Sequence, residues 1–202
     1  MQHIYSSVFP NTSPPGLCNS PDLPKPGFSQ AFLWGWTGWL LLAAGSLQGQ
    51  SFTDQSAYFT VLPPGFSEAY LSWGDYDNDG DLDLLVMGQT GTSTYTTKIY
   101  RNDGTGFVDS GTLDDNLPQL RRGIAVWGDY NEDGRLDILI AGENGSGQAI
   151  SEIYRRNPGP AAPFIKDLTA SSALSGSQVR NACADWGDYD NDGDLDLLIT
   201  GN

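Results

Sequence analysis

The sequence contains few of the residues on which most enzyme active sites depend. Its 202 residues include one histidine, His3, and two cysteines, Cys18 and Cys183. A Ser-His-Asp triad or a histidine-ligated zinc site is therefore not expected, and two cysteines cannot form a disulfide-dense scaffold. Basic residues are also scarce, because ten Lys and Arg accompany 25 Asp and Glu, for a formal net charge of −15. Such an acidic chain is a poor partner for nucleic acid, whose phosphates bind to basic surfaces.

Long apolar runs are also lacking, except in one segment near the N-terminus. Residues 26–53 carry no charge, and the 14 residues of 31–44 are strongly apolar. This run is shorter than the ~20 residues of a membrane span, and small residues such as Gly45 follow it. We predict that residues 1–50 are a leader that contains a secretory signal peptide. An N-terminal anchor that is not cleaved is the alternative.

Cleavage near Gln50 would change what the mature chain can do. It would remove His3, so that no histidine remains for catalysis, and it would leave no candidate membrane span. The mature protein is therefore expected to be secreted or displayed on the cell surface.

Residues 51–202 repeat one motif three times. The sequence Trp-Gly-Asp-Tyr begins at Trp73, Trp127 and Trp186, 54 and then 59 residues apart, and each copy continues into an acidic loop and an apolar run. Weaker repeats lie on both sides of the motif, which extends the repeating unit in both directions. The units cover residues of about 52–106, 107–163 and 164–202.

Each unit reads as four short β-strands. In the second unit the first strand lies around Phe107, the second ends at Trp127, and the third is the apolar run 136–141; the Thr-rich stretch ending at Tyr100 is the fourth strand of the first unit. No segment shows helical periodicity. A unit of about 55 residues with four strands has the size of a propeller blade. We therefore predict an all-β fold of blades with four antiparallel strands. An open stack of hairpins or a β-sandwich is the alternative.

The predicted ring of blades is incomplete. A closed propeller needs ~4–8 blades, whereas the sequence supplies two full repeat units and a partial third. We expect either that the remaining blades belong to a longer gene product or that copies of the chain associate to close the ring.

The acidic loop in each unit, between the second and third strands, has the spacing of a metal site. In the first copy, carboxylates recur at positions 1, 3, 5 and 9, and Gly80 at position 6 permits a sharp turn. Several hard oxygen ligands in a flexible loop favour Ca²⁺, whereas Mg²⁺ keeps more of its waters. The loop is not an EF-hand, because position 12 is apolar in every copy. The residues at that position are Val86, Ile140 and Ile199.

The stretch from Trp73 to Asp83 resembles the calcium-binding loop of FG-GAP/VCBS repeats, the blades of integrin-α-type β-propellers. The resemblance covers roughly residues 52–202 and implies a Ca²⁺ ion in each blade, in the loop between its first two strands. Three calcium sites are thus implied. Their side-chain ligands would be Asp75, Asp77, Asp79 and Asp83; Asp129, Asn131, Asp133 and Asp137; and Asp188, Asp190, Asp192 and Asp196. Asp81, Arg135 and Asp194 would contribute backbone carbonyls.

The second loop departs from the other two. It has Asn131 at position 3 and Arg135 at position 7, which removes one ligand charge and adds a cation nearby. We therefore predict that the second site binds calcium most weakly.

These observations predict a calcium-binding module without catalytic activity, in which the metal is structural. By resemblance, its partners would be extracellular proteins or glycans and its role would be adhesion. A calcium-dependent lectin and the propeller part of a lyase-like, polysaccharide-active enzyme are the alternatives. Acid–base chemistry in such an enzyme would need residues outside the loops. Candidates are Arg121, Arg122, Glu143, Glu152 and Tyr154.

Overall fold

The computed structural model describes residues 4–8, 65–159 and 163–202, and the side chains of the last two of these ranges. All of them belong to one compact unit of the chain. The apolar core 31–44 of the predicted leader and the start of the first repeat near Phe52 lie outside the described residues.

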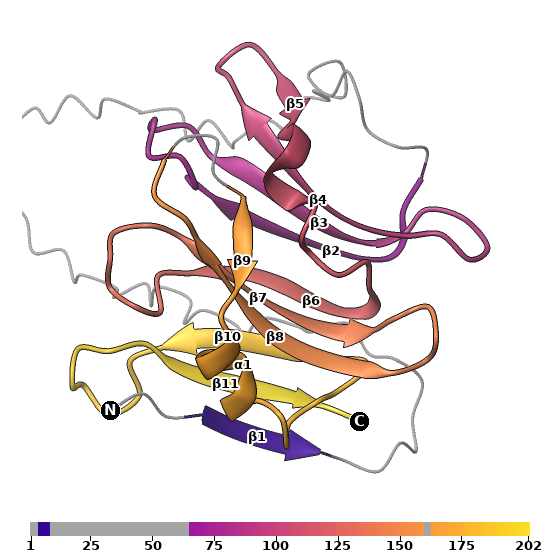
Figure 1. Cartoon of the computed structure of the whole chain (residues 1–202), viewed down its shortest axis with the longest axis vertical. Helices are drawn as coiled ribbons and strands as arrows, with labels where there is room; N and C mark the ends of the chain where they lie inside the picture. The colour runs from indigo at the N-terminus through magenta and orange to yellow at the C-terminus, as the bar shows by residue number, and fades with distance from the viewer. Residues whose placement is uncertain (1–3, 9–64, 160–162) are drawn as a thin grey trace, which may run out of the picture. The chain divides into compact units, whose positions relative to one another are not determined.

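Two antiparallel sheets of four strands form most of the described chain (Figure 1). The first sheet consists of β2 (Ser67–Gly74), β3 (Asp83–Gln89), β4 (Tyr95–Asn102) and β5 (Phe107–Asp109), in that order. The second consists of β6 (Arg121–Gly128), β7 (Asp137–Glu143), β8 (Ala149–Arg156) and β9 (Phe164–Lys166). The predicted all-β class and the predicted four-stranded antiparallel blades are therefore confirmed.

The third sheet has three strands within the described residues. β10 (Cys183–Gly187) pairs antiparallel with β11 (Asp196–Gly201), as the first two strands of the other sheets do. The other edge of β11 pairs in parallel with β1 (Ile4–Val8), in a register that places Ile4 opposite Leu197. β1 belongs to the predicted leader, and no sequence pattern indicated this pairing.

The sheets are offset from the sequence units by one strand. We expected the strand around Phe107 to open the second unit, but β5 pairs with β4 and forms the outer edge of the first sheet. β9 completes the second sheet in the same way, by pairing with β8. β5 pairs with β4 because a short turn after β4 brings the chain back directly beside the unpaired edge of β4. The acidic loops consequently join the first and second strands of each sheet, as the resemblance implied.

Two short helical turns interrupt the strands, although the sequence shows no helical periodicity. They are η2 (Gly111–Asp114) and α1 (Leu168–Ala173). The carboxylate of Asp167 caps α1 by accepting hydrogen bonds from the backbone N–H groups of Thr169 and Ala170. Six residues are too few to show an apolar period, so only the capping residue could have indicated this helix. Within the described ranges, no helix is long and apolar enough to cross a membrane.

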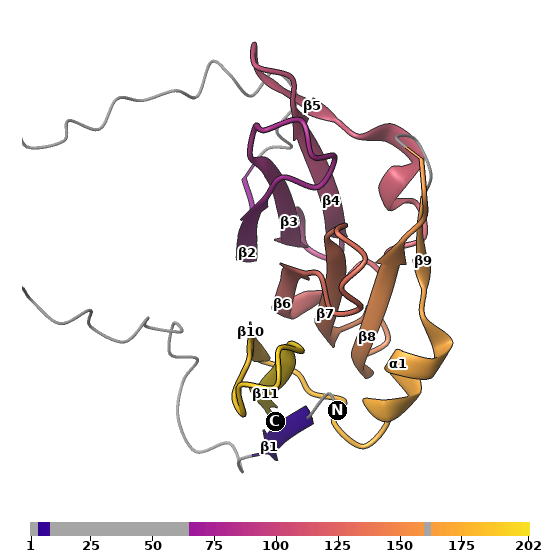
Figure 2. The ribbon, with the colours of Figure 1, turned by 90° about the vertical axis from the view of Figure 1, so that its left-hand side faces the viewer.

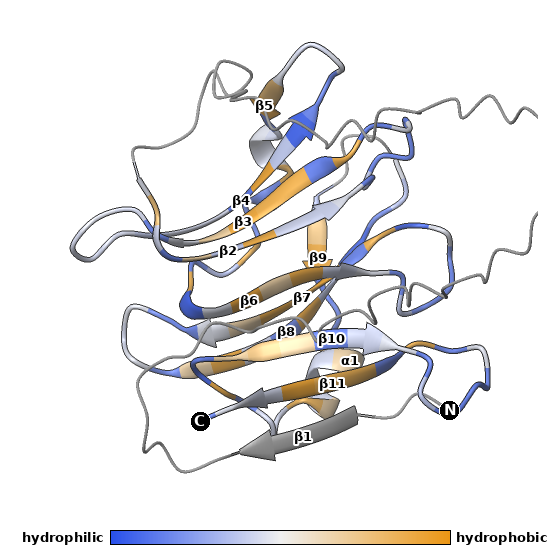
Figure 3. Ribbon diagram, turned by 180° about the vertical axis from the view of Figure 1, so that it is seen from behind, coloured by the Kyte–Doolittle hydropathy of each residue, from blue (hydrophilic) through white to orange (hydrophobic). Residues whose placement is uncertain are grey.

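The first strands of the three sheets, β2, β6 and β10, lie side by side (Figure 2). Because the sheets pack face to face, the second strand of the middle sheet is buried on both faces. Along β7, Ile138 and Ile140 pack against the first sheet, and the alternate residues Leu139 and Ala141 pack against the third. Figure 3 shows the resulting apolar strands inside a rim of polar loops. A continuous apolar run is the pattern expected of a strand buried on both faces.

The tryptophan of each repeat packs on the preceding sheet. Trp127 lies over Gly74 and stacks on Tyr76, with ring centroids 6.0 Å apart and planes inclined by 6°. Its indole N–H also donates a hydrogen bond to the carbonyl of Ser72, at 3.2 Å. Trp186 repeats the arrangement on Gly128 and Tyr130, with centroids 6.4 Å apart and planes inclined by 18°. The glycine is required because a Cβ atom at Gly74 would lie 2.7 Å from the indole of Trp127.

We predict that Gly74→Ala lowers the free energy of unfolding by about 1–3 kcal/mol, because the added methyl group overpacks the contact with Trp127. The matched control is Gly187→Ala, since no atom lies within 4 Å of a Cβ atom at Gly187. Urea denaturation at low protein concentration measures both variants. Equal losses in the two would contradict the packing argument.

Candidate metal centre

The three acidic loops lie along the same edge of the described unit, at the left in Figure 1. Each follows the first strand of its sheet, and these strands run side by side, so their C-terminal ends lie together. Neighbouring loops are in contact. The side-chain amide of Asn78 donates to the carbonyl of Gly134 at 3.2 Å, and a hydrogen bond with Asp194 raises the pKa of Glu132.

Side-chain hydrogen bonds give each loop the same curled shape. Asp75, at position 1, accepts from the backbone N–H groups of Asp79 and Gly80 at 3.0 and 2.9 Å. Asp129 and Asp188 accept equivalent bonds in their own loops. Positions 4 and 6 adopt a positive φ in every copy. Those residues are Asn78, Glu132 and Asn191 at position 4, and Gly80, Gly134 and Gly193 at position 6.

The aspartate at position 9 is buried and ties the loop to the sheet. The carboxylate of Asp83 accepts hydrogen bonds from the backbone N–H of Tyr76 at 3.0 Å and of Asn102, at the end of β4, at 2.8 Å. Asp137 accepts from the N–H of Arg156, at the end of β8, at 2.8 Å. Asp83 therefore links the end of its loop to the start of the loop and to the third strand of the sheet.

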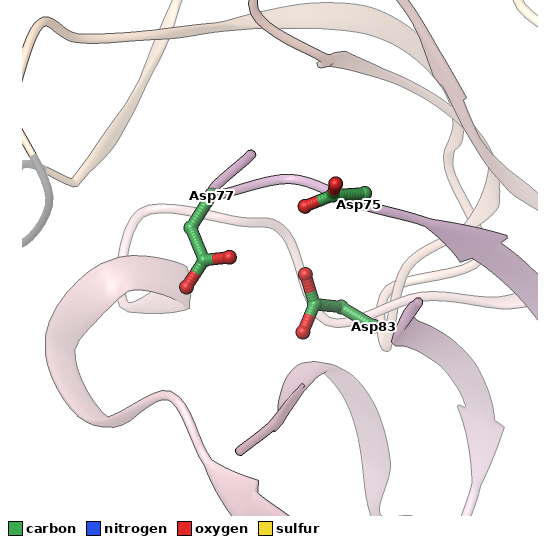
Figure 4. A group of neighbouring side chains, drawn as sticks. All are labelled: Asp75, Asp77 and Asp83. Atoms are coloured by element: carbon green, nitrogen blue, oxygen red, sulfur yellow. The ribbon is translucent and has the colours of Figure 1, made fainter. Parts of the chain in front are cut away.

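Carboxylates at positions 1, 3 and 9 converge in the first and third loops. Oxygen atoms of Asp75, Asp77 and Asp83 all lie within 4.8 Å of one another, close enough to hold one metal ion (Figure 4). One oxygen of Asp77 is buried and has no hydrogen-bond partner. A buried, unsatisfied carboxylate oxygen is costly, so this atom is suited to a ligand that the protein itself does not supply. The group in the third loop is Asp188, Asp190 and Asp196.

Without a cation, the buried carboxylates resist ionisation. Burial raises the pKa of Asp83 to about 6, with Asp77 and Asp79 adding to the effect, although two backbone N–H groups oppose it. Burial likewise raises the pKa of Asp137 to about 7, and Asp133 and Asp129 contribute in the same direction. The pKa of Asp77 is raised by burial and by Asp79. A bound cation would favour the ionised form of each group.

The aspartates at position 5 are engaged within their own loops. Asp79, Asp133 and Asp192 each accept a hydrogen bond from the backbone N–H of position 7, at 2.9–3.1 Å. The residues at position 7 are Asp81, Arg135 and Asp194. These six residues belong to the predicted ligand set. In the first and third loops, the carboxylates that the structure brings within reach of one ion are those at positions 1, 3 and 9.

The second loop differs from its neighbours in the way that its sequence suggests. The side-chain amide of Asn131 donates to the carboxylate of Asp137 at 2.9 Å, so one ligand position is held by the loop itself. Arg135 forms an ion pair with Asp133, which reduces the negative charge of the second loop.

The residues considered for an enzymatic role lie outside the acidic loops and form ion pairs and hydrogen bonds with one another or with neighbouring side chains. Glu143, at the end of β7, is buried and pairs with Arg121 at 2.7 Å, with Arg180 at 3.6 Å and with Arg122 at 4.0 Å. Arg122 also pairs with Glu68 of the first sheet at 3.1 Å. The carboxylate of Glu152 accepts from Lys166 at 2.6 Å and from the hydroxyl of Tyr154 at 2.7 Å.

Comparisons with known proteins agree with the repeats. The family model for the FG-GAP-like repeat matches residues 75–140 and 129–199. Cartilage acidic protein 1 of Homo sapiens is 24% identical over 153 residues, which make up 74% of this chain and 22% of that protein. No solved structure matches significantly. Since the family model covers more than half of the sequence, the chain belongs to the FG-GAP-like repeat family.

Proposed function

We propose that the chain is a calcium-binding propeller module that acts outside the cell or on its surface, with calcium in a structural role. The observation that carries this proposal is the group of Asp75, Asp77 and Asp83, whose oxygens lie within 4.8 Å of one another and include a buried oxygen of Asp77 without a partner. The same backbone curl recurs in all three loops and the carboxylate group recurs in the third, which favours a specific site over a solvated acidic turn.

The chemistry of the loops favours calcium over other metals. All the candidate ligands are oxygen atoms, which suit hard cations, and no histidine or cysteine lies among them. Ca²⁺ accepts six to eight oxygens at irregular positions in a flexible loop, whereas Mg²⁺ demands a near-ideal octahedron. The curled backbone, held by Asp75 and turned at Gly80, supplies such a loop.

The position of these carboxylates explains what the metal would stabilise. Asp75 follows the end of β2, Asp83 begins β3, and Asp83 also accepts the N–H of Asn102 at the end of β4. When bound, calcium supplies the positive charge that offsets the mutual repulsion of these groups. The loop residues would then hold three strands of one sheet together at their shared edge.

The role of the module is proposed to be binding, with an extracellular protein or glycan as partner. The aspartates of the loops would be committed to the metal. Membership of the FG-GAP-like family and the likeness to a protein named for cartilage support an extracellular setting. Arrays of glycans and of matrix proteins, each probed with and without chelator, separate a lectin from a protein adhesin. Release of products from an acidic polysaccharide would instead favour the enzyme alternative.

We predict that removing calcium lowers the melting temperature substantially. At millimolar calcium, a site with a dissociation constant of ~0.1 mM adds about 1.4 kcal/mol to the free energy of unfolding. Three such sites would shift the melting temperature of a domain of this size by roughly 10 °C. Calorimetry in excess calcium and in excess chelator measures the shift, and magnesium at equal concentration is the control. An unchanged melting temperature would reject the calcium sites.

The three sites should differ in affinity, with the second site the weakest. Asn131 and Arg135 reduce the negative charge that faces the second site, so Asn131→Asp together with Arg135→Asp should raise its affinity toward that of the others. Calorimetric titration of chains that retain one intact loop, made by Asp→Asn changes at positions 1 and 3 of the other two, compares the sites directly. Equal affinities for the three unmodified loops would contradict this order.

The metal-free protein should lose stability as the pH rises. The pKa of Asp83 is about 6 in the folded chain, above its ordinary value of 3.8, so folding disfavours ionisation of this group. Its contribution to stability is therefore present below pH 4 and lost as the pH rises toward and above 6. Saturating calcium should reverse the trend, since protons then compete with the metal. Melting curves of wild type and Asp83→Asn, both dialysed free of metal, should differ in slope between pH 4 and 6. Parallel curves would show that Asp83 does not cause the effect.

A further inference from the structure

The contact that joins one sheet to the next has two complementary halves. One half is a tryptophan with a neighbouring leucine, as in Trp127 and Leu136, and we call it the knob. The other is the glycine, tyrosine and leucine of the preceding sheet on which the knob packs, and we call it the socket. The buried socket residues are Gly74, Tyr76 and Leu85 in the first sheet, and Gly128, Tyr130 and Leu139 in the second.

The first sheet carries a knob that packs on no preceding sheet in the described unit. Trp73 is 55% exposed, whereas the equivalent Trp127 is 7% exposed. Trp73 is nevertheless held in position, because its ring lies 5.8 Å from that of Phe107 at an angle of 53°. The equivalent rings of Trp127 and Phe164 lie 5.9 Å apart at 49°. The exposed indole is therefore already oriented as in the buried contact.

The third sheet carries the opposite half, a socket that is open. No atom lies within 4 Å of a Cβ atom placed on Gly187, whereas a Cβ on Gly128 would meet the indole of Trp186 at 2.5 Å. Tyr189 is 72% exposed, compared with 8% for Tyr130. Leu198 is 56% exposed, while the equivalent Leu139 is completely buried. The socket thus has the same residue types in the same places, but Tyr189 and Leu198 are more than half exposed.

Exposed apolar side chains are concentrated on these two surfaces. Within the described part of the chain, five of the six large apolar residues that are exposed belong to the two ends. They are Leu71, Trp73 and Leu82 on the first sheet, and Tyr189 and Leu198 on the third. The sixth, Leu168, lies on α1. Apolar side chains grouped in this way mark an interaction surface, whereas a single one needs no explanation.

We infer that the knob of one copy of this chain docks into the socket of a second copy, with Trp73 lying over Gly187 and against Tyr189. The partner is a second copy because each chain presents both halves of a contact that already forms twice within it. Docking would repeat that contact and bury the exposed residues at both ends. The association is head to tail, so repeated addition leads to a ring or a filament, not to a symmetric dimer.

Docking would also bring acidic loops together. The first loop of one copy would lie beside the third loop of the other, as the first and second loops do through Asn78 and Gly134. Because these loops are strongly acidic, bound calcium should favour the association by reducing their repulsion. The experiment that tests this association should therefore be done in millimolar calcium.

Two variants of the full chain each remove one half of the contact. Trp73→Ser removes the knob and keeps the socket, and Gly187→Val fills the socket and keeps the knob. Trp73 is more than half exposed and no atom lies within 4 Å of a Cβ atom on Gly187, so neither change should prevent folding, and the melting temperature at low concentration verifies this. Leu168→Ser is the matched control, because Leu168 is a large apolar residue that is 74% exposed and lies outside both surfaces.

Sedimentation velocity across a range of protein concentrations should show that the wild-type chain and Leu168→Ser associate. Each end variant alone should have a dissociation constant at least tenfold higher. An equimolar mixture of the two should form a one-to-one dimer that grows no further, since each partner supplies the half that the other lacks.

Three results would overturn the inference. The first is a wild-type chain that stays monomeric, which would leave the socket to a further repeat of the same polypeptide. The second is association of the end variants with wild-type affinity, which would place the contact elsewhere. The third is a mixture that forms no dimer although the wild-type chain associates.

Discussion

The packing of each sheet on its predecessor depends on one contact, an indole laid across the backbone of a glycine. A side chain at Gly74 or Gly128 would separate the sheets, because the ring of Trp127 or Trp186 approaches to within 3 Å of the place where a Cβ would stand. The apolar residues of β3, β7 and β11 meet only because this close approach allows it. The burial of both faces of β7 is a consequence of the same contact.

The acidic loops and the packing contact are parts of one motif. In Trp-Gly-Asp-Tyr, Trp127 and Gly128 pack against neighbouring sheets, Asp129 curls the loop, and Tyr130 receives the next tryptophan. A change in the shape of the loop would therefore move the tyrosine on which the adjoining sheet stacks. The three loops also hold 14 of the 25 acidic residues, so most of the negative charge of the protein lies along one edge.

The sequence was sufficient to predict the features that depend on local spacing. The strands, the acidic loops and the position of Gly80 follow from residue types within one repeat. The place of Phe107–Asp109 could not be predicted, because a three-residue strand pairs equally well with the strand before it or after it until the turn geometry is known. The stacking of Trp127 on Tyr76 was also missed, since the sequence alone does not indicate which residues of adjacent repeats meet. The pairing of β1 with β11 has no local signal at all.

The offset between sequence units and sheets has a consequence for how the number of repeats can change. A stretch of gene that begins before Phe107 and ends before Phe164 encodes the last strand of one sheet and the first three of the next. Duplicating or deleting that stretch would leave each complete sheet with four strands, and each tryptophan that follows a complete sheet would still have a glycine on which to pack. Recombination at this boundary therefore lengthens or shortens the protein without exposing a new edge.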